Sequence, residues 1–144
     1  MRQCRTGELV VFHDDTVDQL TSGAGPVAEL AFDELKCLDA GAKFEQRFQG
    51  ERIPSFEEVL ELLGGNILIN IELKTESIRN DGLEAKVADL VRKKNLQSSV
   101  IVSSFNPSSI RRIKRQDAGL CTALLFSNDQ PLYLRRAWAT RMIR

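Results

Sequence analysis

Residues 67–74 constrain the fold of this chain more than any other segment. They read Ile-Leu-Ile-Asn-Ile-Glu-Leu-Lys, an apolar run that predicts a strand with an acid and a base two residues apart. Alternate side chains of a strand share a face, so one face carries Asn70, Glu72 and Lys74 and the other is entirely aliphatic. Burying such charges is costly unless they pair or bind a ligand or a metal. We therefore expect one face to pack on helices and the other to become polar toward the carboxyl end, where active sites form in parallel α/β barrels.

Strands and helices are expected to alternate along the rest of the chain. Short apolar runs predict further strands at residues 9–12, 100–104 and 120–126. Sequence patterning predicts helices at residues 31–38, 56–63 and 83–94, from 107 onward, and from 131 to the end. This order implies right-handed β-α-β units and a parallel sheet, so the predicted fold class is α/β.

Local signals place the ends of these helices. Ser55 and Glu58 have the spacing of a capping box at the start of the second helix. Asn106 is a suitable N-cap for the helix that begins at Pro107. Gly41 is expected to stop the helix that begins near residue 31.

Length and composition indicate a single globular domain over residues 1–144, because 42% of the residues are apolar and 28% are charged. Twenty basic and twenty acidic residues give no net charge, which argues against nucleic acid or an anionic membrane as a partner. No apolar run approaches the ~18 residues of a membrane span, and no export signal is visible at the start, so we expect a cytoplasmic protein. The three cysteines are widely spread and suit free thiols in a reducing compartment.

The C-terminal tail, residues 127–144, differs in character from the rest. Four arginines accompany Tyr133 and Trp138, and no acidic residue follows Asp129. Such a basic aromatic tail is suited to contact nucleic acid or lipid. A solvated helix face or a non-native terminus is the simpler interpretation, and we prefer it.

Six segments, taken together, resemble the glycerophosphodiester phosphodiesterase family in order and spacing, over about residues 5 to 126. The segments are GELVVFHDDT (7–16), TSGAG (21–25), EL with LDAG (34–41), RIPSFEEVL (52–60), IELK (71–74) and SSFN (103–106). The resemblance implies a TIM (β/α)8 barrel that uses Mg²⁺ or Ca²⁺ to hydrolyse glycerophosphodiesters to an alcohol and glycerol 3-phosphate. It also implies a role in lipid metabolism.

The same resemblance assigns roles to three residues. His13 matches one of two catalytic histidines of the family, Glu72 a metal-binding carboxylate, and Lys74 a lysine near the substrate phosphate. The residue types suit these roles. Histidine exchanges protons near neutral pH, a hard cation prefers carboxylate oxygen, and an ammonium group attracts a phosphate.

The chain also departs from the family pattern. The family places a His-Arg-Gly strand, a Glu-Asn-Thr turn and a Glu-x-Asp strand before the segment that matches Gly7, and this sequence begins where the last of these would end. Gln19 replaces a customary arginine, the match fades beyond Phe126, and Trp138 does not replace the family's tryptophan segment. We therefore expect a partial barrel, compared with the ~250 residues of a complete one, with an incomplete cation site.

Alternatives stay open for the function and for each candidate residue. His13 is also compatible with a structural role, Glu72 and Lys74 with an ion pair that binds no ligand, and Asp14 with a turn or a supporting contact. Ser104 and Phe105 either line the mouth of the site or pack in the core. The chain is a phosphodiesterase with part of its site, or a non-catalytic truncated fragment or interaction module of the same fold. In either case, open sheet edges favour self-association.

Overall fold

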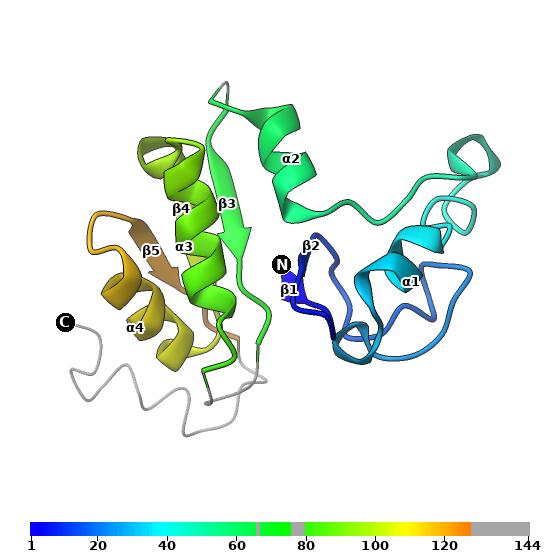
Figure 1. Ribbon diagram of the computed structural model, residues 1–144, viewed down its shortest axis with the longest axis horizontal. Coiled ribbons are helices and arrows are strands. Elements are labelled where there is room, and N and C mark those ends of the chain that lie inside the picture. Colours follow the sequence, from blue (N-terminus) through cyan, green and yellow to red (C-terminus); the bar gives the residue numbers. More distant parts are fainter. Residues whose placement is uncertain (66, 76–79, 128–144) are drawn as a thin grey trace. The chain divides into compact units, whose positions relative to one another are not determined.

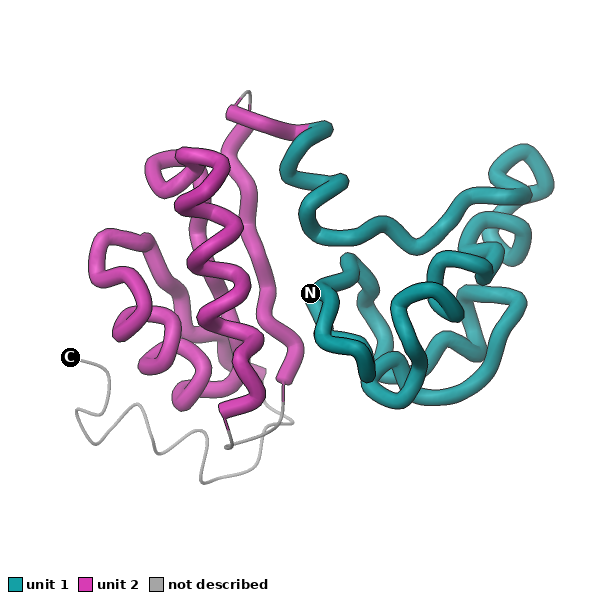
Figure 2. Tube along the Cα trace, in the orientation of Figure 1, with its two compact units in different colours: residues 1–62 teal, residues 63–144 magenta. Residues whose placement is uncertain are grey.

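The structure is a computed structural model that describes residues 1–65, 67–75 and 80–127. The chain divides into two compact units, with the boundary between Leu62 and Leu63 (Figure 2). Each unit is described by itself below. The helix predicted from residue 131 and nearly all of the 127–144 tail lie outside the described residues.

The first unit contains short strands and helices joined by long loops (Figure 1). Its elements are β1 (Arg2–Gln3), β2 (Leu9–Val10), the 3-10 helices η1 (Val27–Glu29) and η2 (Gln46–Phe48), α1 (Phe32–Cys37), and α2 (Phe56–Leu63), which ends at the unit boundary. The strand predicted at residues 9–12 is thus only two residues long, and it pairs with β1 in an antiparallel ladder. Only a few residues separate the two strands, and a parallel pairing needs a crossover of a dozen or more.

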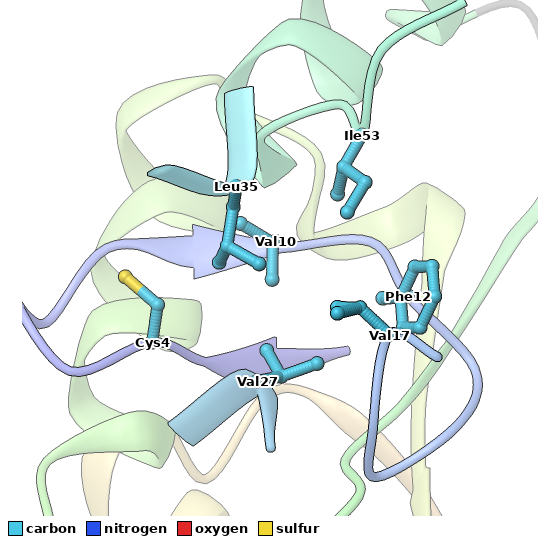
Figure 3. Close-up of a cluster of buried hydrophobic side chains, with 7 residues drawn as sticks. All are labelled: Cys4, Val10, Phe12, Val17, Val27, Leu35 and Ile53. Atoms are coloured by element: carbon cyan, nitrogen blue, oxygen red, sulfur yellow. The ribbon is translucent and has the colours of Figure 1, made fainter. Parts of the chain in front are cut away.

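A small apolar core supports the segment that carries His13. Figure 3 shows seven buried side chains gathered around β2 and α1: Cys4, Val10, Phe12, Val17, Val27, Leu35 and Ile53. Val10 is 0% and Phe12 is 9% exposed, whereas Val11 between them is 37% exposed. This alternation directs His13 to the same side as Val11, away from the core, because residues two apart in extended chain share a face.

A tight loop after α1 depends on Asp39 and Gly41. The Asp39 carboxylate accepts hydrogen bonds from the backbone N–H groups of Gly41, Ala42 and Gly50, each at 2.9 Å. A Cβ atom on Gly41 would lie 1.9 Å from the Phe48 carbonyl oxygen, so this position requires glycine. The predicted helix nevertheless ends earlier, at Cys37, because Leu38 already has an extended backbone.

The second unit contains three parallel strands in the order β3-β4-β5 (Figure 1). The strands are β3 (Ile69–Glu72), β4 (Val100–Ser104) and β5 (Cys121–Leu124), connected through α3 (Leu83–Lys93), the 3-10 helix η3 (Gln97–Ser99) and α4 (Pro107–Gln116). Parallel strands thus alternate with helices, as predicted. The three strands form an open sheet within the described part of the chain.

One face of this sheet is apolar and buried, and the other is more open. Ile71, Leu73 and Val102 are at most 4% exposed, while Ile101 on the opposite face is 42% exposed. The buried sides of α3 and α4 supply the apolar side chains Val87, Ala88, Val91, Ile110 and Ile113. No helix among the described residues has the length and apolar character that crossing a bilayer requires.

A buried ion pair joins α3 to α4. The Glu84 side chain is 1% exposed, and its Oε1 accepts hydrogen bonds from Ser109 Oγ at 2.5 Å and from the Arg112 guanidinium at 2.8 Å. Glu84 lies in the first turn of α3, where a carboxylate also interacts favourably with the helix dipole. This contact therefore fixes the two helices to each other behind the sheet.

Candidate functional site

The carboxyl end of β3 brings Glu72 and Lys74 together, as the strand alternation predicts. Lys74 Nζ lies 3.2 Å from Glu72 Oε1. The side chains of Lys74 and Glu72 are only 18% and 29% exposed, so both charged groups are partly withdrawn from water. A carboxylate and an ammonium held in this way can accept a cation and an anion, respectively, or neutralise each other.

Ser103 extends this polar face onto the next strand. In the parallel register, Glu72 of β3 lies beside Ser103 of β4, which in turn lies beside Ala123 of β5. Ser103 is 1% exposed, and its hydroxyl has no hydrogen-bond partner among the described residues. A buried hydroxyl without a partner is unfavourable, so Ser103 is a candidate ligand-binding group that sequence reasoning missed. Two sequence signals point to it: a small polar residue at the end of an apolar strand, and its place in the SSFN segment that resembles the family.

Ser104 and Asn106 lie where β4 turns into α4. Ser104 is fully buried, and its hydroxyl donates a hydrogen bond of 2.8 Å to the carbonyl of Leu73. Asn106 caps α4 as predicted, since its Oδ1 accepts from the Ser108 N–H at 3.0 Å. Ser104 is thus a hydrogen-bonded residue of the interior, whereas Phe105 beside it is 38% exposed.

His13 belongs to the first unit, and its side chain is 75% exposed. Its Nδ1 lies 2.6 Å from Asp14 Oδ1, and its carbonyl oxygen accepts hydrogen bonds from the Arg2 guanidinium at 3.0 and 3.2 Å. Arg2 also pairs with Asp15 at 2.5 Å. When Nδ1 donates its proton to Asp14, the basic nitrogen is Nε2, which is the arrangement a general base requires. Asp14 therefore has the supporting contact that the sequence left as one alternative.

Among the described residues, the acidic, histidine and thiol side chains do not assemble into a complete cation site. No group of three or more histidine, cysteine, aspartate or glutamate side chains comes together among the residues that the structure describes. The carboxylate of Glu72 faces the Lys74 ammonium, and a hard cation takes about six oxygen ligands. The described residues therefore do not fit a complete Mg²⁺ or Ca²⁺ site.

Shifted pKa values mark structural carboxylates of the first unit. Backbone N–H groups, that of Ala42 first, lower the pKa of Asp39. The pKa of Glu58 is lowered chiefly by the Lys36 ammonium and then by the N–H of Ser55. Glu58 and Ser55 form both hydrogen bonds of the predicted capping box, at 2.7 and 3.1 Å. These shifts therefore reflect helix capping and loop closure.

Known proteins are similar in sequence to this chain along most of its length. The model of the glycerophosphoryl diester phosphodiesterase family matches residues 2–144. A glycerophosphodiester phosphodiesterase of Caldanaerobacter subterraneus subsp. tengcongensis is 43% identical over 123 residues, which are 85% of this chain and 51% of that protein. Human glycerophosphodiester phosphodiesterase 1 is 31% identical over 121 residues, or 82% of this chain and 36% of that protein. The chain spans about half the length of the first curated relatives that it matches.

Solved structures of phosphodiesterases are also similar to this chain. A glycerophosphodiester phosphodiesterase from Agrobacterium tumefaciens has a TM-score of 0.76 at 33% identity, covering 84% of this chain and 50% of that one. A phosphodiesterase from Oleispira antarctica, in complex with the product sn-glycerol-3-phosphate, has a TM-score of 0.74 at 26% identity, covering 95% and 56%. These likenesses confirm the predicted fold class, a partial TIM barrel of parallel strands alternating with helices.

Proposed function

Because the chain belongs to the glycerophosphoryl diester phosphodiesterase family, we propose that the protein hydrolyses glycerophosphodiesters to an alcohol and glycerol 3-phosphate. Since the chain spans about half the length of its curated relatives, it contributes part of the catalytic machinery. The observation that carries the proposal is the pairing of Lys74 with Glu72 at the carboxyl end of β3, within a chain that matches the family model along its length. Such hydrolysis belongs to lipid metabolism.

The proposal gives each candidate residue one task. Lys74 attracts the substrate phosphate, because its side chain is only 18% exposed and its charge is only partly screened by water. His13 moves a proton to or from the glycerol or leaving-group oxygen, with Asp14 holding its Nδ1. Glu72 would supply one oxygen ligand to a divalent cation, Mg²⁺ or Ca²⁺, although no group of three or more histidine, cysteine, aspartate or glutamate side chains comes together among the described residues.

A hybrid enzyme tests these assignments. This chain replaces the matched half of the Caldanaerobacter relative, and turnover of glycerophosphocholine is measured with Mg²⁺ or Ca²⁺. His13→Ala in the hybrid is expected to lower kcat by about 10²- to 10⁴-fold, the usual contribution of a general acid or base. Lys74→Met is expected to raise KM. Lys36→Met is the matched control, since it breaks an ion pair of the same kind, to Glu58. Turnover that is unaffected by His13→Ala would remove this residue from the mechanism.

The alternative is that the 144-residue chain by itself is a non-catalytic fragment or interaction module. The absence of a metal-binding cluster among the described residues favours it. The purified chain is then expected to show no cation-dependent turnover of glycerophosphocholine, even at concentrations at which the hybrid enzyme turns it over rapidly. Turnover by the chain alone, with normal cation dependence, would dismiss this alternative.

We further propose a reducing compartment, such as the cytoplasm, for this protein. Cys4, Cys37 and Cys121 are all free thiols in the structure, and such thiols persist where glutathione and thioredoxin keep them reduced. Thiol alkylation under denaturing conditions, applied to protein taken directly from cells, measures this, because Cys4 is buried in the folded chain. Three modified cysteines per chain are the expected result, and fewer would contradict the assignment.

A further inference from the structure

The backbone on both sides of Lys74 is held by side chains from the neighbouring strand and helix. On one side, the carbonyl oxygen of Leu73 accepts the 2.8 Å hydrogen bond from Ser104 Oγ. On the other, the carbonyl oxygen of Thr75 accepts a hydrogen bond of 3.2 Å from Asn106 Nδ2. Ser104 and Asn106 are 0% and 5% exposed, so water competes little for either contact. We call these two hydrogen bonds the Lys74 bracket.

The bracket is needed because β3 ends before Lys74. The strand finishes at Glu72, and beyond it the Leu73 N–H donates a hydrogen bond of 2.7 Å to the Ser103 carbonyl. Lys74 and Thr75 follow in irregular backbone. Irregular backbone opens more readily than a strand inside a ladder unless side chains hold it. Side-chain hydrogen bonds from the neighbouring strand and helix therefore help to fix the position of this segment.

The bracket is itself anchored to the start of α4. Ser104 Oγ accepts a hydrogen bond of 3.1 Å from the Asn106 N–H, which links the two halves of the bracket. Asn106 Oδ1 caps the Ser108 N–H at 3.0 Å, so the Asn106 side chain is fixed at both its oxygen and its nitrogen. A buried network in which the members share hydrogen bonds is more rigid than its separate contacts.

We propose that Ser104 and Asn106 are positioning residues that place the Lys74 ammonium, paired with the Glu72 carboxylate, where it meets the substrate phosphate. This inference rests on the proposed function. Lys74 has a four-carbon stem with many rotamers, so the location of its ammonium depends on the location of its backbone. A displaced ammonium attracts the phosphate less strongly, so displacement is expected to weaken substrate binding and raise KM.

Two variants and a matched control separate positioning from simple stability. Ser104→Ala removes the hydrogen bond to Leu73. Asn106→Ser keeps a residue that caps α4 but removes the donor to Thr75. Ser109→Ala is the control, because Ser109 is also fully buried and also donates one hydrogen bond, to Glu84, outside the bracket.

Hydrogen–deuterium exchange of the 144-residue chain measures the bracket directly. Exchange at residues 73–75 is expected to become about fivefold faster in Ser104→Ala and in Asn106→Ser, the change that loss of one buried hydrogen bond produces. Ser109→Ala is expected to leave exchange at these residues unchanged. Equal exchange in all three variants would overturn the bracket. If Ser104→Ala does not fold, exchange at residues 73–75 in Asn106→Ser tests the bracket by itself.

Kinetics of the hybrid enzyme then test what the bracket does. At a temperature where circular dichroism shows each variant folded, a displaced Lys74 is expected to raise KM for glycerophosphocholine about tenfold. A loss of folded protein lowers kcat and leaves KM unchanged, which is the result expected for Ser109→Ala. Faster exchange with an unchanged KM would overturn positioning. An inactive unmodified hybrid would refute the proposed function instead, while the exchange result would still decide whether the bracket exists.

Discussion

Removal of Arg112 from the α3–α4 interface is expected to destabilise the second unit strongly. Arg112 is 12% and Glu84 is 1% exposed, and their side chains meet at 2.8 Å. Arg112→Met keeps most of the aliphatic stem but leaves the Glu84 carboxylate buried, with Ser109 as its remaining donor among the described residues. A buried charge deprived of its partner costs about 3–5 kcal/mol. For a unit of this size, such a loss corresponds to a decrease in Tm on the order of 15 °C.

The double variant separates two quantities: the cost of leaving one buried charge unpaired, and the net contribution of the ion pair to stability. Replacing both members of a buried ion pair by apolar residues of similar volume is often neutral, or even stabilising by about 1–4 kcal/mol. Glu84→Met combined with Arg112→Met is therefore expected to recover most of the stability that Arg112→Met loses. Arg92→Met is the control, because Arg92 pairs with Asp89 at 49% and 70% exposure, where an ion pair contributes under about 1 kcal/mol.

Urea unfolding, followed through amide signals of α3 and α4, reports on this unit alone. The expected order of stability is wild type, Arg92→Met and the double variant close together, with Arg112→Met well below them. If Arg112→Met proves no more harmful than Arg92→Met, the burial of Glu84 imposes no such penalty. A double variant as unstable as the sum of its two single changes would refute the same reasoning, because the two side chains would then act independently.

Four further outcomes are expected. Gly41→Ala should lower stability by about 2 kcal/mol or more in thermal unfolding, since its Cβ would overlap the Phe48 carbonyl; an unchanged Tm would contradict the close approach. The pKa of Asp39 lies below its ordinary 3.8, owing first to the Ala42 N–H, so its stabilisation is present above pH 3.8 and is lost as pH falls through the folded pKa. Unfolding from pH 7 to 2 should therefore depend on pH less in Asp39→Asn than in the wild type, and equal profiles would refute this. Ser103→Ala should leave the free energy of unfolding unchanged or slightly higher, because its hydroxyl has no partner to lose among the described residues, and a loss above about 1 kcal/mol would show otherwise. Sedimentation of the chain should reveal concentration-dependent association through exposed strand edges, whereas a single monomeric species at all concentrations would count against it.

Local sequence signals determined much of the fold. The capping box at Ser55 and Glu58 placed the start of α2 at Phe56, and Asn106 with Pro107 placed the start of α4. Both signals work because the first N–H groups of a helix need acceptors that only nearby residues supply. Pairing between strands has no such local signal. The sequence therefore predicts neither the antiparallel ladder of Leu9 with its partner strand nor the early end of β3.

The same limit applies to the candidate site. Alternation within one strand is a local rule, and it correctly put Glu72 and Lys74 on one face, where they pair at 3.2 Å. The rule says nothing about where a residue beyond the strand's last ladder contact comes to rest. For Lys74 that position depends on Ser104 and Asn106, some thirty residues further along the chain, whose hydrogen bonds reach back across the sheet. A sequence pattern can thus identify the charged groups of such a site, but their placement requires the register between strands, which only the folded structure defines.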